Sequence, residues 1–303
     1  MEIKGISTIM ITPFQENGDL DLGSLSSMVR FQMRAGVHGL TILGIMGEAH
    51  KLTELERSQV IETVVKEVDG RIPVTVGCTA NGTDVAVYYS KMAEALGANA
   101  VMVAPPANLK NYELIFQHYA AIGRSVSLPI VIQDEPVTTN VLLPAAFQAR
   151  LEREIENIKY CKLEEAPSPM KITNLLKETY GQLTVFGGLG GVYFYEELLR
   201  GACGIMTGFA FPEVLVAVYN AFTAGDKTKA RDIFYKYLPL IRFEAQLGIG
   251  GVTIRKEIFK ERGIIKSSHV RSPGVPVDLT TLGEMKDLLE CLDLSEDTVQ
   301  IKA

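Results

Sequence analysis

Short apolar segments rich in β-branched residues recur along the chain, separated by longer amphipathic segments. The intervening segments carry helical periodicity, as in Leu25, Met28, Val29 and Met33, and Thr53 with Glu56 forms the pattern of a helix capping box. Strands that alternate with helices in this way indicate parallel βα units. Eight predicted strands cover residues 6–11, 39–43, 74–77, 100–103, 130–132, 158–162, 184–186 and 204–206.

Eight strands, each followed by a helix, predict an α/β fold of the (β/α)8 TIM barrel type. A doubly wound sheet remains the alternative, because the order of strands in a sheet cannot be read from one sequence. The strand pattern stops at Ala224, and residues 227–246, 252–261 and 280–292 have the pattern of helices. We therefore expect a barrel over residues 1–224 and a C-terminal helical extension over residues 225–303.

Charge and composition limit the partners of the chain. The net charge is −6, from 30 basic and 36 acidic residues, and no basic run is present. This balance favours a small-molecule partner over nucleic acid or a membrane surface. No stretch approaches the ~20 apolar residues of a membrane span, and the first residues lack the pattern of a signal peptide, so we expect a cytoplasmic protein.

The cysteines and histidines argue against disulfides and metal sites. The cysteines are widely scattered, and the histidines lack the spacing of metal ligands. We expect free thiols and a site without metal or organic cofactor. The residues concerned are Cys78, Cys161, Cys203, Cys291, His38, His50, His118 and His269.

Lys162 and Glu164 are the predicted catalytic residues. In the sixth predicted strand, Ile158, Tyr160, Lys162 and Glu164 alternate with their neighbours, so all four are expected to face the barrel interior. A lysine at the end of an inward-facing strand is costly to bury as a cation, which favours a free, nucleophilic amine. A carboxylate two residues on can move protons for it. The alternative is an interior ion pair without catalytic function.

Three further segments are candidate substrate contacts. The turn Gly44-Ile45-Met46-Gly47-Glu48 follows the second strand, and its glycines allow backbone N–H groups to face a carboxylate. Gly187 and Gly188 follow the seventh strand and allow close approach of a ligand, although helix packing explains them equally well. Gln133 and Glu135 share one face at the end of the fifth strand, where they contact substrate hydroxyls or serve the structure.

The turn at residues 44–48, taken together with Lys162, resembles the dihydrodipicolinate synthase/N-acetylneuraminate lyase superfamily. The similarity extends over essentially the whole chain and includes Thr12-Pro13-Phe14, Leu52-Thr53, Pro136 and the segment 201–208. The resemblance implies that Lys162 forms a Schiff base with a 2-oxo acid and that the backbone at Ile45 and Met46 holds the substrate carboxylate. We also expect Ile205, in the eighth predicted strand, to contact the substrate. The resemblance also suggests a homotetramer.

Departures from the family pattern narrow the expected reaction. The family's tyrosine on the fifth strand is replaced by Gln133, and Ile45, Met46 and Ala107 stand where the synthase has hydroxyl-bearing residues. The synthase proton relay is therefore missing, and we expect Glu164 to take its place. Within the superfamily the chain looks most similar to the 2-keto-3-deoxy sugar acid dehydratases, especially the ketodeoxyarabonate type.

Two alternatives to a dehydratase remain open from the sequence. One is a pyruvate-dependent aldolase or a 4-hydroxy-tetrahydrodipicolinate synthase-like enzyme, which would use the same lysine. The other is a non-catalytic protein that binds a 2-oxo or sugar acid. The retention of Lys162 with Glu164 argues against the second, because a binding pocket gains little from a buried amine.

Overall fold

The computed structural model describes residues 1–246 and 250–294 of the chain. In these residues, eight parallel strands pair in sequence order, and the eighth pairs with the first, so that the sheet closes into a barrel. This confirms the (β/α)8 barrel and excludes the doubly wound sheet. The strands are β1 (Gly5–Ile9), β2 (Gly39–Ile42), β3 (Val74–Gly77), β4 (Ala100–Val103), β5 (Ile130–Asp134), β6 (Ile158–Leu163), β7 (Thr184–Gly187) and β8 (Gly204–Thr207).

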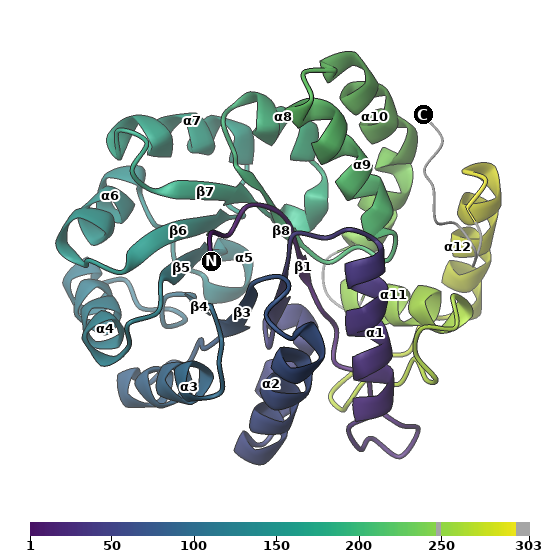
Figure 1. The fold of residues 1–303 in the computed structure, drawn as a ribbon, viewed down its shortest axis with the longest axis horizontal. Helices are drawn as coiled ribbons and strands as arrows, with labels where there is room; N and C mark the ends of the chain where they lie inside the picture. Colours follow the sequence, from purple (N-terminus) through teal and green to yellow (C-terminus); the bar gives the residue numbers. More distant parts are fainter. Residues whose placement is uncertain (247–249, 295–303) are drawn as a thin grey trace.

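Helices surround the barrel, as Figure 1 shows. The predicted capping box opens α2: the Thr53 hydroxyl accepts from the Glu56 N–H, while the Glu56 carboxylate accepts from the Thr53 N–H. The helices of the barrel are α1 (Leu22–Arg34), α2 (Glu54–Val68), α3 (Thr83–Ala95), α4 (Tyr112–Ser125), α5 (Pro136–Thr139), α6 (Ala145–Glu154), α7 (Ser168–Glu178), α8 (Phe194–Leu199) and α9 (Pro212–Thr223).

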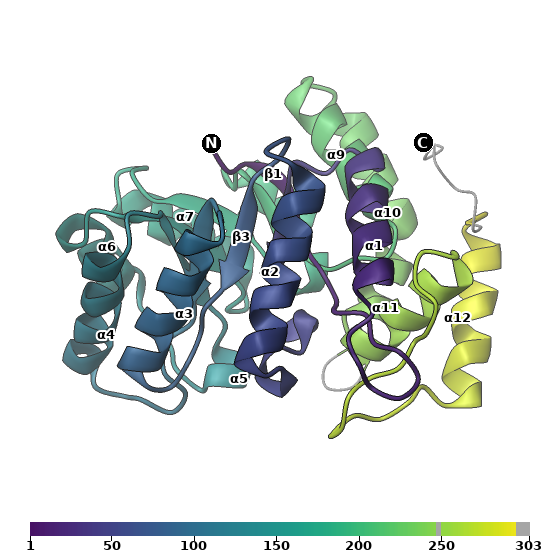
Figure 2. The same ribbon diagram turned by 60° about the horizontal axis from the view of Figure 1, so that its bottom comes forward.

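The C-terminal extension consists of helices that pack on one side of the barrel. They are α10 (Lys227–Glu244), α11 (Gly250–Glu261) and α12 (Leu279–Cys291), and short 3₁₀ turns η1 (Ile45–Gly47), η2 (Ala49–Lys51) and η3 (Leu189–Gly191) lie at the barrel mouth. Both views place α11 beside α1 (Figures 1 and 2), and the rings of Phe31 and Phe259 meet edge to face there. The predicted helices are confirmed within two residues at their ends. Residues 247–249 and 295–303 lie outside the described residues, and the domain division at Ala224 stays a prediction.

Charged contacts fasten the extension to the barrel. Lys256 of α11 donates to Glu48 over 2.5 Å, and both side chains are buried. Arg271, after α11, donates to both carboxylate oxygens of Glu56 and to the carbonyl of Lys51. The extension is therefore held against the turns that follow β2, at the carboxyl ends of the strands.

The apolar side chains divide between two clusters. An inner cluster fills the barrel and includes Ile9, Met102, Val131, Phe186 and Met206. A larger cluster lies between the strands and the helices. Membership of one cluster or the other therefore shows whether a side chain faces the barrel interior or the helical layer.

Strand β6 departs from the alternation that the sequence suggested. Its pairing with β5 shifts by one residue, since Ile130 pairs with Ile158 whereas Val131 pairs with Tyr160. Lys159 is the extra residue of this β-bulge. Ile158 faces the helical layer with Cys161, whereas Tyr160 faces the interior. The expectation for Ile158 was therefore wrong, because a bulge reverses the alternation and leaves no clear sign in the sequence.

The cysteines are free, as the sequence predicted. Cys78 and Cys161 are buried, Cys203 is partly buried and Cys291 is exposed. No helix among the described residues is both long enough and apolar enough to span a membrane.

Candidate active site

Lys162 lies near the carboxyl end of β6, where register pairs it with Gln133 of β5 and Phe186 of β7. Because Phe186 belongs to the inner cluster, Lys162 also faces the barrel interior. Its Nζ lies 2.8 Å from Oε2 of Glu164, and the side chains are 6% and 12% exposed. Gln133 donates from Nε2 to the same Glu164 oxygen over 3.2 Å. The amine of Lys162 and the carboxylate of Glu164 are therefore in direct contact at the barrel mouth.

A cavity of about 470 Å³ opens above this pair. The volume suits a small ligand. Its charged lining residues, within the described part of the chain, are Lys162, Glu164, Glu135 and Arg255. Its other lining residues are Ile9, Gly44, Ile45, Met46, Met102, Gln133, Val137, Thr138, Leu189, Gly190, Val192, Thr207, Gly208, Ala245, Gln246, Gly251 and Val252.

The turn after β2 contributes part of the predicted contact set to the cavity. Gly44, Ile45 and Met46 line the cavity, and Ile45 is 42% exposed. Gly47 does not line it; its carbonyl accepts from the Thr12 hydroxyl over 2.7 Å. The Glu48 carboxylate is buried away from the cavity and forms ion pairs with Lys51 and Lys256. The carboxylate of Glu48 therefore joins the turn to α11.

Gly187 and Gly188 make room for carboxylates. A Cβ atom at Gly188 would lie 2.4 Å from Cγ of Glu164, and one at Gly187 would lie 1.7 Å from Oε2 of Glu197. Neither glycine lines the cavity, and Ile205 of β8 does not line it either. Gly188 therefore acts through Glu164, by leaving the space that its side chain occupies.

Glu135 and Gln133 both line the cavity, but their polar groups are engaged. The Glu135 carboxylate caps α5 by accepting from the Thr138 N–H over 2.8 Å. Gln133 is the amide donor to Glu164. Of these two predicted contacts, Glu135 caps the short helix after β5 and Gln133 donates to the Glu164 carboxylate.

Arg255 of α11 is a cavity residue that the sequence analysis did not identify. Its Nε donates to Glu244 of α10 over 3.0 Å, and the pair is buried. Burial raises the pKa of Glu244 to about 7, while Arg255 opposes that shift. Periodicity predicts that residues 252–261 form a helix, but it does not say which part of the barrel the helix covers.

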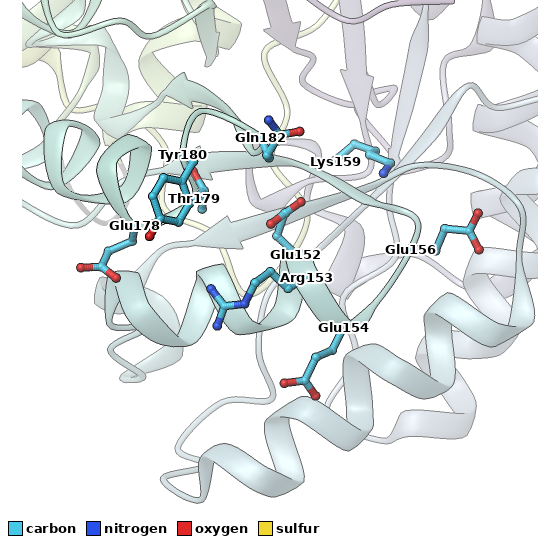
Figure 3. A pocket seen from close by; sticks show the side chains of 9 residues that line it. All are labelled: Glu152, Arg153, Glu154, Glu156, Lys159, Glu178, Thr179, Tyr180 and Gln182. Atoms are coloured by element: carbon cyan, nitrogen blue, oxygen red, sulfur yellow. The ribbon is translucent and has the colours of Figure 1, made fainter.

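Other features of the described residues lie apart from this pair. A hollow of about 560 Å³ lies at the amino ends of β6 and β7, with Lys159 and Tyr180 at its edge, and Figure 3 shows its lining. Lys162 lies at the opposite ends of the strands. No group of three His, Cys, Asp or Glu side chains in residues 1–246 and 250–294 is arranged to hold a metal ion. The expected absence of a metal stays a prediction.

Comparison with known proteins identifies the family. The model of the dihydrodipicolinate synthetase family matches residues 2–292. The chain is 32% identical to L-2-keto-3-deoxyarabonate dehydratase of Azospirillum brasilense, over 96% of this chain and 94% of that protein. It is 30% identical to 4-hydroxy-tetrahydrodipicolinate synthase of Phocaeicola vulgatus, over 96% of this chain and 98% of that protein.

Solved structures agree with this assignment. Dihydrodipicolinate synthase from Rhodopseudomonas palustris superposes with a TM-score of 0.90 at 33% identity, covering 95% of this chain and 97% of that chain. A putative dihydrodipicolinate synthetase from Pseudomonas aeruginosa superposes with a TM-score of 0.91 at 30% identity, covering 96% of this chain and 100% of that chain. The sequence-based assignment is confirmed: this chain belongs to the dihydrodipicolinate synthetase family of Schiff-base lyases.

Proposed function

We propose that this protein dehydrates a 2-keto-3-deoxy sugar acid through a Schiff base on Lys162. The observation that carries the proposal is the 2.8 Å contact between Lys162 and Glu164 in a cavity whose described lining holds no tyrosine. Proton transfer then depends on Glu164, the carboxylate in contact with the lysine. The L-2-keto-3-deoxyarabonate dehydratase among the relatives supports the choice of substrate class.

The first stage forms the Schiff base. Glu164 accepts a proton from the Lys162 ammonium group, and the free amine attacks the C2 keto carbon. Protons transferred through Glu164 let the C2 oxygen leave as water, and a protonated imine remains. The backbone of Ile45 and Met46 holds the substrate carboxylate in this proposal, while Gln133 keeps one Glu164 oxygen directed at Lys162.

The second stage removes water from the substrate. Glu164 takes the C3 proton, and the C3–H electrons move into the C2–C3 bond to give an enamine. The enamine then expels the C4 hydroxyl, which leaves as water with the proton that Glu164 holds, so that C3 and C4 become doubly bonded. One carboxylate thus acts first as base and then as acid, and hydrolysis of the imine releases the product.

The test combines adduct mapping with product analysis. Borohydride reduction in the presence of pyruvate or 2-keto-3-deoxyarabonate should fix an adduct on Lys162, and Lys162→Ala should abolish it. Lys159→Ala is the matched control, since Lys159 is exposed at the other end of the same strand. Without borohydride, the sugar acid should lose one molecule of water per turnover.

The second candidate is an aldolase or synthase, which the 4-hydroxy-tetrahydrodipicolinate synthase relatives favour. This reaction would pass through the same Lys162 adduct, so only the product distinguishes it from dehydration. Release of pyruvate from the sugar acid would favour an aldolase, whereas loss of water alone would favour the dehydratase. Failure to form an adduct with any 2-oxo acid would overturn both reactions and leave a binding protein.

We also propose that the protein is a cytoplasmic homotetramer. Exposed apolar side chains support self-association: Tyr112 donates to the carbonyl of Leu142, and Leu114 and Leu142 are 49% and 58% exposed. Free thiols are usual in a reducing compartment. Light scattering on the eluting protein measures the mass, and a monomer would contradict this part of the proposal.

A further inference from the structure

Arg255 brings a buried donor to the cavity from outside the barrel. Its Nε donates to Glu244, and its Nη1 lies 3.3 Å from the sulfur of Met46. Nη2 is buried and has no hydrogen-bond partner among residues 1–246 and 250–294. Nη2 is closed to solvent, whereas Nη1 lies against a thioether sulfur, which is a weak acceptor, so Nη1 is the arm that can turn to an oxygen brought by a ligand.

Two glycines lie against the guanidinium group. A Cβ atom at Gly251 would lie 3.3 Å from Nη1, and one at Gly208 would lie 3.5 Å from it. Gly208, Gly251 and Arg255 all line the cavity. The guanidinium group therefore forms part of the wall that faces a ligand, on the side of β8 and α11.

The other charged groups of the cavity, and the Gln133 amide, already have partners. Lys162 and Glu164 are engaged with each other, and Gln133 donates to Glu164. Glu135 caps α5 on the β5 side of the cavity. Arg255 Nη1, whose acceptor is a thioether sulfur, therefore offers a donor on the β8 side, whereas the carboxylate on the β5 side already has a partner.

We propose that Arg255 determines substrate specificity by donating from Nη1 to a substrate oxygen beyond C3. The inference rests on the proposed function, in which C2 is bonded to Lys162 and the C1 carboxylate lies at the turn after β2. The part of the substrate beyond C3 then has to meet the remaining wall, where Nη1 lies beside Gly208 and Gly251. Arg255 is thus a specificity residue contributed by the C-terminal extension, and it selects sugar acids that carry a C4 or C5 hydroxyl.

The experiment compares two probes that differ beyond C3. Pyruvate ends at C3, whereas 2-keto-3-deoxyarabonate carries hydroxyls further on. The concentration that gives half-maximal borohydride trapping on Lys162 is measured for each probe, in the wild-type protein and in Arg255→Lys. Lysine keeps a cation opposite Glu244 but lacks the second donor arm of the guanidinium group.

We expect the half-saturating concentration of the sugar acid to rise about 10- to 100-fold in Arg255→Lys, because a charge-assisted hydrogen bond is lost. The value for pyruvate should change less than about 2-fold. Equal weakening of both probes would overturn the proposal, since it would indicate a contact with C1 or a structural role. An unchanged value for the sugar acid would overturn it as well.

Two further variants serve as controls for this experiment. Arg262→Lys is the matched control, because Arg262 pairs with Glu213 over 2.8 Å in the same extension and does not line the cavity; both probes should bind it as they bind the wild type. If Arg255→Lys folds poorly, Arg255→Met combined with Glu244→Gln removes the buried pair together and should show the same selective loss. Absence of any wild-type adduct would instead refute the proposed function itself.

Discussion

Gly188 holds the space in which Glu164 lies. A Cβ atom at Gly188 would be 2.4 Å from Cγ and 3.0 Å from Cδ of Glu164, closer than real side chains approach. The space at Gly188 is therefore set by the carboxylate that contacts Lys162.

Gly188→Ala should displace Glu164 and lower kcat about 10- to 100-fold, because a misplacement of about 1 Å is enough to disturb proton transfer. Borohydride trapping of pyruvate on Lys162 should persist, since the lysine itself is untouched. Gly283→Ala is the control, because no atom lies within 4 Å of its added Cβ. Equal kcat values for the two variants would show that Glu164 has another place to lie.

Glu164→Gln should lower kcat about 10²- to 10⁴-fold, the usual contribution of a general acid–base group. The adduct with pyruvate should form more slowly but still reach completion on long incubation, because water can carry the protons of imine formation, so that turnover and trapping separate. Glu165→Gln changes the neighbouring carboxylate, which pairs with Lys171 instead of the catalytic lysine, and it should retain activity. Full activity of Glu164→Gln would assign the proton transfers to another group.

Glu48→Ala should destabilise the protein by about 3 kcal/mol, because it leaves the buried Lys256 without a carboxylate. Burial already lowers the pKa of Lys256 to about 8. Urea denaturation measures the change, with Glu2→Ala as the control, since Glu2 forms an exposed pair with Lys4. Replacing the pair together, as Glu48→Gln with Lys256→Met, should recover much of the loss; an unaltered midpoint in Glu48→Ala would refute the role of the pair.

The stability of the fold should fall as the pH rises from about 4.5 to about 8. Burial raises the pKa of Glu197 from 4.5 to about 8, while the Ser168 hydroxyl donates to Oε1 over 2.6 Å. The unfolded chain releases this proton near 4.5 and the folded chain keeps it until about 8, so the folded state binds more protons between these values.

The stability that Glu197 contributes is therefore fully present below pH 4.5, and it is lost as the pH rises through the pKa of about 8 that Glu197 has in the folded state. At ~1.4 kcal/mol per pKa unit, its loss should amount to about 5 kcal/mol across this window. Melting temperatures over a pH series measure the slope, and Glu197→Gln should flatten it. A variant with the same slope as the wild type would assign the dependence to other groups.

The sequence predicted the scaffold well because its signals are local. Each strand is a short apolar run that begins within one residue of its predicted start, and the predicted catalytic pair, Lys162 and Glu164, stands two residues apart at the end of β6. The first predicted strand extended to Ile11, whereas β1 ends at Ile9. The residues beyond are still apolar and buried, so hydrophobicity alone gives no sign of where the pairing stops.

Contacts between distant segments could not be predicted from the sequence. Glu48 was expected to bind substrate, but its carboxylate meets Lys256, 208 residues further along the chain. Arg255 reaches the cavity because α11 packs over the barrel mouth, and periodicity fixes neither the position nor the rotation of a helix. The cap that Glu135 forms depends on where the short helix α5 begins, which a four-residue segment does not reveal.

The bulge at Lys159 makes the direction of the nucleophile depend on the number of residues in β6. Ile158 faces the helices, and Lys162 follows it by four positions, an even spacing that would direct the lysine outward in a regular strand. The inserted residue reverses this parity. Chemistry at the barrel mouth is thus sensitive to the length of a strand as well as to its composition, and a one-residue deletion that spares every site residue would still turn the amine away from its substrate.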